Sequence, residues 1–120
     1  MVHGELMANL YKRTLTSLVS TVSTTAFTVP AATSAVVKSI LVSNSNAGAT
    51  VAEVVISPAG VGSHIIIPAE TIAAKGFVDF AAGWDRNPNV LVLEAGDLLK
   101  IKVTTADVVA TVSVLLIDRN

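Results

Sequence analysis

Two histidines are the residues of this chain best suited to acid–base chemistry. His3 lies near the N-terminus, and His64 begins an apolar segment directly after a Gly-Ser pair. A catalytic histidine needs a nucleophile and an orienting carboxylate beside it, and no two histidines stand at metal-ligand spacing. The chain has no cysteine, which excludes disulfides and thiolate metal sites. We therefore interpret His64 as structural or exposed and predict no catalytic residue and no metal site.

The carboxylates after the N-terminal segment fall mostly at predicted turns or outward strand positions: Glu53, Glu70, Asp79, Asp85, Glu94, Asp97, Asp107 and Asp118. Hydrogen bonds to nearby backbone explain acidic residues at turns. A glycosidase would need two carboxyls facing each other across a cleft, and this chain is small for that. A calcium site at Glu94, Asp97 and neighbouring carbonyls stays open, without EF-hand spacing. Phosphate-binding glycine motifs are also absent, so we predict no enzyme and no cofactor.

Charge is scarce in this chain. Charged residues make up 14%, apolar residues 52%, and the net charge is −1. This balance gives no electrostatic reason to bind nucleic acid or an anionic membrane. The longest dense apolar run, Val108–Ile117, is too short to span a bilayer and suits a core strand. A small β-domain with so little charge exposes apolar surface and strand edges, so we predict a homo-oligomer or another assembly subunit.

Strict alternation follows the predicted turn Glu94–Asp97. Leu99, Ile101 and Val103 alternate with lysines and a threonine, so a period of two places the apolar set on a core face. The lysines are then expected to face water. Because Thr105–Asp107 is short enough for a hairpin loop, we predict that this strand and the last strand form a hairpin.

The last strand carries a second apolar face. Every other residue from Val108 to Leu116 is apolar, whereas the opposite parity begins with polar residues and ends with Leu115 and Ile117. This strand is therefore expected to be buried on both faces near its end. We predict that Leu115 and Ile117 are covered by the N-terminal segment or by a partner chain.

The segment Ala35–Asn44 is apolar on both parities. We expect Ile40 and Val42 to face the core, in which case Lys38 has the wrong parity. A bulge near Val37, or a lysine that escapes at the rim of the sheet, would resolve this conflict.

Further strands are predicted along the rest of the chain. Thr50–Ser57 is expected to return from the turn Asn44–Gly48 and to complete a hairpin with the preceding strand. We expect His64–Ile67 to be a short strand that Pro68 closes, and Phe77–Phe80 to be another, with alternate residues facing the core.

Additional strands are expected at Tyr11–Leu18, at Ala26–Val29 and at the start of the C-terminal block, Val90–Leu93. The total is eight or nine short strands with turn signals about every 8–12 residues. This pattern predicts an all-β protein, an antiparallel β-sandwich of jelly-roll or immunoglobulin-like type. We expect a single domain over residues 10–120, preceded by a flexible tail or arm over residues 1–9.

The candidate contact residues are Tyr11, Trp84, Arg86, Leu115 and Ile117. Tryptophan and arginine are frequent anchors of protein interfaces, and here both lie in one predicted loop. Two other readings of Trp84 stay open, namely that it caps one end of the sandwich or that it stacks on a sugar ring. The segment before Tyr11 is interpreted as a tail or as an arm that orders on a neighbouring subunit.

Several segments resemble small structural proteins of tailed bacteriophages: AVVKSILVSNSNAGATVAEVVIS, HIIIPAETI, LVLEAGDLLKIKV and VATVSVLLID. The resemblance covers roughly Leu10 to Asp118 and consists of strand and turn signatures. It implies a virion structural protein, a decoration, tail or fibre component that is assembled in the bacterial host cytoplasm. Of these we expect a capsid decoration protein that stabilises the head shell. The implied partners are the major capsid protein or other virion proteins.

One of these segments keeps a different function open. The stem Ile67–Thr71 also occurs in unrelated adhesive sandwiches. The alternative is a receptor- or glycan-binding module, or a neck, tail or fibre component.

Overall fold

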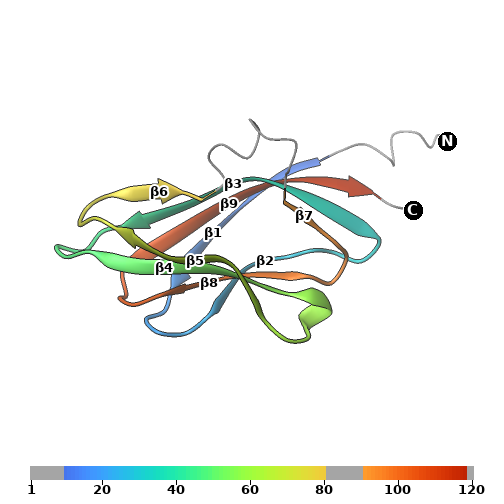
Figure 1. The fold of residues 1–120 in the computed structure, drawn as a ribbon. Helices are drawn as coiled ribbons and strands as arrows, with labels where there is room; N and C mark the ends of the chain where they lie inside the picture. The colour runs from blue at the N-terminus through green and yellow to red at the C-terminus, as the bar shows by residue number, and fades with distance from the viewer. Residues whose placement is uncertain (1–9, 81–90, 119–120) are drawn as a thin grey trace.

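The computed structural model describes residues 10–80 and 91–118, which form nine strands in two antiparallel sheets packed face to face (Figure 1). Sheet A has the order β1-β9-β3-β6, with β7 also paired to β3: β1 (Leu10–Leu18), β9 (Val108–Asp118), β3 (Thr33–Asn44), β6 (Phe77–Asp79) and β7 (Val92–Leu93). Sheet B has the order β2-β8-β4-β5: β2 (Thr24–Thr28), β8 (Leu98–Val103), β4 (Thr50–Ser57) and β5 (His64–Ile72). One 3-10 turn, Pro58–Gly60, follows β4. The predicted all-β antiparallel sandwich is confirmed.

The core lies between the two sheets and is built mainly from alternate residues of each strand. The exceptions are β2, where the adjacent residues Ala26 and Phe27 are both buried, and β3, where the inward parity changes within the strand. Ile40 and Val42 of β3 are fully buried, as their parity predicted. The inward residues of the two C-terminal strands are buried as well: Leu99, Ile101, Val103, Val108, Ala110, Val112, Val114 and Leu116. The alternation in the sequence therefore identified the inner face of β8 and β9.

Neither of the two predicted hairpins forms. β3 lies in sheet A and β4 in sheet B, and β8 and β9 are divided in the same way. The short loops over residues 45–49 and 104–107 therefore cross from one sheet to the other. Sheets in a sandwich lie about 10 Å apart, a gap that a few residues can cross. Two strands with alternating apolar residues bury their apolar sides equally well whether they pair in one sheet or face each other across the core from two sheets.

A bulge interrupts the pairing of β3 with β9, as the parity of Lys38 predicted. Val37 is opposite Val114 and Ser39 is opposite Ser113, so Lys38 is the extra residue. The lysine is exposed, while Val37 remains in the core. The bulge changes which residues of β3 face outward: even-numbered before it and odd-numbered after it.

Pro68 does not end a strand, contrary to the prediction. β5 continues through Pro68 to Ile72, and its pairing with β4 is irregular at two places. A proline lacks the N–H that a central strand needs, but β5 is an edge strand of sheet B. The sequence alone did not show that this strand has a neighbour on one side only.

The turn after β3 is held by the buried side chain of Asn44. Its amide nitrogen donates to the carbonyls of Gly48 at 2.9 Å, Ile72 at 3.2 Å and Ala73 at 3.1 Å. Its oxygen accepts hydrogen bonds from the backbone N–H and the side-chain amide of Asn46 at 3.0 and 2.9 Å. Asn44 therefore joins the end of sheet A to loops of sheet B.

Candidate functional site

The sequence left open a calcium site at the turn Glu94–Asp97. In the structure, the Asp97 carboxylate is used for hydrogen bonds within the protein. Asp97 accepts hydrogen bonds from the backbone N–H of Ala59 at 3.0 Å and of Glu94 at 2.8 Å. One carboxylate oxygen therefore closes the turn Glu94–Asp97 itself, and the other holds this turn against the loop after β4. Over residues 10–80 and 91–118, no group of three or more histidine, cysteine or acidic residues is placed to hold a metal ion.

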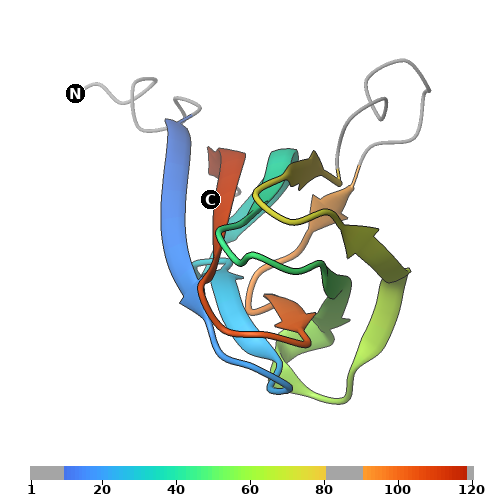
Figure 2. The same cartoon turned by 90° about the vertical axis from the view of Figure 1, so that its left-hand side faces the viewer.

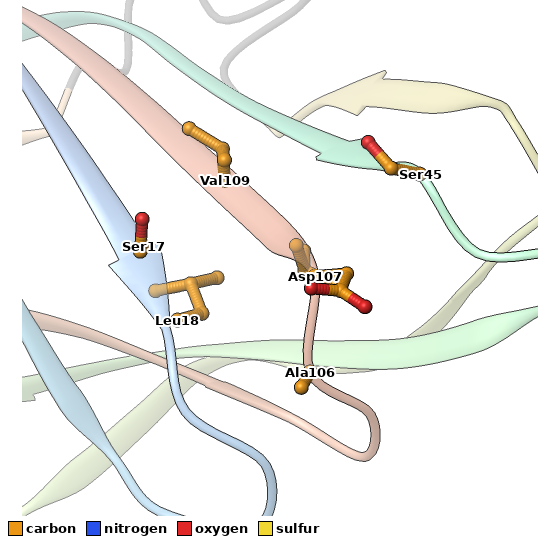
Figure 3. A pocket seen from close by; sticks show the side chains of 7 residues that line it. Ser17, Leu18, Ser45, Ala106, Asp107 and Val109 are labelled. Carbon is orange, nitrogen blue, oxygen red and sulfur yellow. The ribbon is translucent and has the colours of Figure 1, made fainter.

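A shallow cleft of about 520 Å³ lies where β1 ends beside the loop before β9 (Figure 3). Its lining includes two serines and the carboxylate of Asp107, among apolar side chains: Ser17, Leu18, Ser45, Ala106, Asp107, Val108 and Val109. Activation of a serine requires an adjacent general base, and this lining contains no histidine or lysine. We therefore do not assign this cleft a catalytic role.

An apolar row crosses the outer face of sheet A. Tyr11 of β1 is opposite Leu115 of β9, Leu115 is opposite Val36 of β3, and Val36 is opposite Val92 of β7. Tyr11 is 72% exposed and Val92 is 45% exposed, while the two central residues are half-buried. We call these four residues, which belong to four adjacent strands, the apolar row.

More exposed apolar side chains lie on the same face. Leu15 of β1 is 63% exposed, and Phe77 of β6 is 70% exposed. Ile117 is half-buried, two residues beyond Leu115 on the same parity. Between these residues the outer face of sheet A presents mainly serine and threonine. The surface therefore offers apolar contacts with few charges.

The structure brings two of the five candidate contact residues into direct register. Tyr11 and Leu115 are cross-strand neighbours, and Ile117 is close to them on β9. Leu115 and Ile117 are half-buried, and the N-terminal segment lies outside the described residues, so the prediction that this segment or a partner chain covers them stays a prediction. Trp84 and Arg86 lie outside the described part of the chain, so their predicted role as contact residues stays a prediction.

Sequence reasoning missed Val36 and Val92 as members of this surface. The segment Ala35–Asn44 was known to be apolar on both parities, and this was the available signal. However, the bulge at Lys38 reverses the outward parity along the strand. Identifying Val36 required the position of the bulge and the neighbours of β3.

No helix in the described residues is both long and apolar enough to cross a membrane. No protein-family model matches the chain, and no curated protein matches it.

Among the solved structures that match are two described as a pentameric capsid protein isolated from metagenomic phage sequences, one of them solved by iodide SAD phasing. Each is 18% identical over 94% of this chain, with TM-scores of 0.36 and 0.35. The chain spans 62% and 66% of the two matched chains, less than two thirds of either. Similarity at this level carries no inference about the fold or function of this chain.

Proposed function

We propose that this chain is a non-enzymatic structural subunit of a tailed-phage virion, and within the virion a decoration protein that stabilises the head shell. The observation that carries the proposal is the apolar row on the outer face of sheet A. Exposed apolar surface rimmed by polar residues is typical of protein interaction sites. The resemblance of the strand and turn segments to tailed-phage structural proteins supplies the biological setting.

The strand order supports this class of protein. Sheets ordered β1-β9-β3-β6 and β2-β8-β4-β5 fit a jelly roll, in which short loops repeatedly change sheets. Jelly rolls occur in viral capsid proteins, lectins and cupins. The order therefore favours the jelly-roll form of the predicted sandwich over the immunoglobulin-like form, and it is compatible with either a capsid or a binding role.

The mechanism is burial of the apolar row against the major capsid protein or another virion protein. Complete burial of one large apolar side chain contributes about 1.5–3 kcal/mol, so a few such residues suffice for specific docking. A protein that binds only the assembled shell shifts the equilibrium toward that shell by mass action, by about 2.7 kcal/mol at one hundred times Kd. No covalent chemistry is required.

Copy number and location in purified particles test this function. A decoration protein is expected in many copies on the head, and shells that lack it should lose integrity at a lower temperature. Adding the purified protein back should restore the thermal resistance. A few copies confined to a tail or fibre, with unchanged head stability, would contradict the proposal.

A receptor- or glycan-binding role is the second candidate, and one loop favours it. Val61 is 73% exposed in the loop after β4, and Asp97 fixes this loop through the N–H of Ala59. Positive φ angles at Ala59, Gly60 and Gly62 set its path. An exposed apolar side chain on such a loop suits contact with another molecule. In this case, Val61→Ser should reduce attachment to host cells and leave head stability unchanged.

A further inference from the structure

The edge of β1 is the least protected strand edge among the described residues. Natural sheets protect their edges with short strands, prolines, bulges or charged residues. β6 and β7 have three and two residues, β5 contains Pro68 and two irregularities, and β2 has a register shift. β1 pairs with β9 over nine residues without a shift, and Figure 2 shows it at the border of the sandwich. Its opposite edge has no strand partner in the described chain, and only Lys12 and Arg13 place charge on it.

The outward-facing residues along this edge follow a regular pattern. Apolar side chains recur every four residues at Tyr11, Leu15 and Val19, which are 72%, 63% and 55% exposed. The exposed polar residues Arg13 and Ser17 lie between them. The edge therefore presents apolar, arginine, apolar, serine and apolar side chains in turn. The order of apolar and polar positions is symmetric about Leu15, so the edge is complementary to a second copy of itself that runs in the opposite direction.

We propose that β1, together with the adjoining Val19, pairs antiparallel with the same segment of a second copy of this chain, about a two-fold axis at Leu15. In this register Leu15 is opposite its own copy, and Tyr11 is opposite Val19 of the second copy, twice per dimer. An isologous pair of this kind closes on itself and leaves no unpaired edge at this position. The inference does not rest on the proposed function, because it concerns the free protein.

Charge and polarity determine the register of this pair. When the outer faces of both copies are continuous, directly opposed residues have the same parity. Axes at Lys12 or Arg13 oppose like charges. An axis one residue to either side of Leu15 sets this leucine against Arg13 or Ser17 of the second copy, and axes nearer the ends of the strand pair fewer residues. The axis at Leu15 is the one that matches apolar with apolar and polar with polar side chains over the whole segment.

The shallow cleft at the end of β1 supplies polar partners for the arginine. In the proposed register, Arg13 of the second copy is opposite Ser17, which is itself opposite Val109 of β9. Ser17 and Val109 line the cleft together with Asp107 (Figure 3). The guanidinium therefore lies at the rim of a cleft that contains a carboxylate and two serine hydroxyls, all of which accept hydrogen bonds. The two copies of Arg13 are roughly 13 Å apart along the strands, so their mutual repulsion is largely screened.

A single cysteine tests the axis directly, since the chain has no cysteine of its own. Leu15→Cys sets two thiols opposite each other, and directly opposed residues of an antiparallel pair have Cα atoms about 4.5–5.5 Å apart, within disulfide range. We expect mild oxidation of the full-length variant to give a disulfide-linked dimer on a non-reducing gel. Ser17→Cys is the matched control on the same exposed face, because its two copies are too far apart to be bridged.

Sedimentation equilibrium of the full chain measures the affinity. We expect the wild type to dimerise and Leu15→Lys to raise the dimer Kd about tenfold or more, because it opposes two like charges at the axis. Arg13→Gln should raise Kd about threefold, since it removes the charge that faces the cleft. Ile65→Lys is the control, because it changes an apolar side chain of similar exposure on sheet B. Circular dichroism and Tm should show that all variants fold.

Two results would overturn the proposal. One is a wild-type protein that stays monomeric at all concentrations, which would assign the β1 edge to a different partner or to none. The other is a dimer whose Kd is unaffected by Leu15→Lys, or in which Ser17→Cys cross-links as fast as Leu15→Cys. Neither result bears on shell decoration, which is measured with particles and with substitutions in β7 and β9.

Discussion

The outer faces of the two sheets differ sharply in composition although both follow the same period of two. On sheet B, Lys102 is opposite Glu53, and Lys100 is opposite Thr25 of β2 and the buried Val55 of β4. On sheet A, the corresponding positions across β1, β9, β3 and β7 form the apolar row. The charged face is typical of a solvated surface, whereas the apolar face is typical of a contact surface. Alternation alone identifies the residues that face the core. The chemistry of the outward-facing residues indicates whether an outer face is solvated or contacts a partner.

The largest loss of stability is expected for a substitution on the inner face of β3, and the outer face of the same strand provides the comparison. Ile40 is fully buried, and its neighbour Leu41 is half-buried on the outer face of sheet A. We expect Ile40→Ala to lower the free energy of unfolding by about 2–5 kcal/mol because it leaves a cavity. Leu41→Ala should lower it by only about 1 kcal/mol. Urea unfolding measures both, and equal losses would show that Leu41 is part of the core.

A second effect is expected at Asn44, which joins the two sheets. Asn44→Ala removes the partners of three carbonyls and of the Asn46 N–H. Unsatisfied buried polar groups typically cost about 1–3 kcal/mol, and we expect a loss of stability in that range. Ser45→Ala is the control, since Ser45 is exposed. Thermal unfolding compares the two variants, and an unchanged Tm for Asn44→Ala would contradict the role assigned to this side chain.

A smaller effect is expected on the charged face. Lys102→Glu places a like charge opposite Glu53 and should lower stability by about 0.2–1 kcal/mol. The effect should shrink at high ionic strength because both side chains are accessible to solvent. Urea unfolding at two salt concentrations is the measurement. A loss as large as that of a core substitution would mean that the outer face of sheet B is not simply solvated.

The smallest effect is expected for added salt on the affinity of this protein for head shells. Docking through the apolar row should be almost unchanged up to about 0.5 M salt, since screening acts on exposed charges. Docking through Lys100 and Lys102 would weaken instead. Quantifying the protein that cosediments with shells across a salt series distinguishes the two faces.

Much of the fold was predictable from local pattern. Alternation identified the inner residues of β8 and β9, and the misplaced parity of Lys38 located the bulge. These features depend only on a period of two and on the burial of apolar side chains. The pairing partners were not predictable, because a short loop fits a hairpin and a sheet change equally well. The continuation of β5 through Pro68 was missed for the related reason that edge position is a property of the whole sheet.

The candidate surface was predictable only in part. Leu115 and Ile117 were identified because their strand carries a second apolar face. Val36 and Val92 were missed because they become neighbours of Leu115 only through long-range pairing. The contact role of Trp84 in the predicted loop stays a prediction, because that loop lies outside the described residues.

Binding of matched variants to purified head shells stripped of this protein tests the central claim most directly. The double variant Leu115→Ser, Val92→Ser removes two members of the apolar row, and Ile65→Ser removes an apolar side chain that is 59% exposed on sheet B. The account predicts that the double variant raises Kd for shells about one hundredfold or more, while Ile65→Ser leaves it nearly unchanged. Equal affinity of the double variant and the wild type, with both folded, would contradict the assignment of sheet A as the docking face.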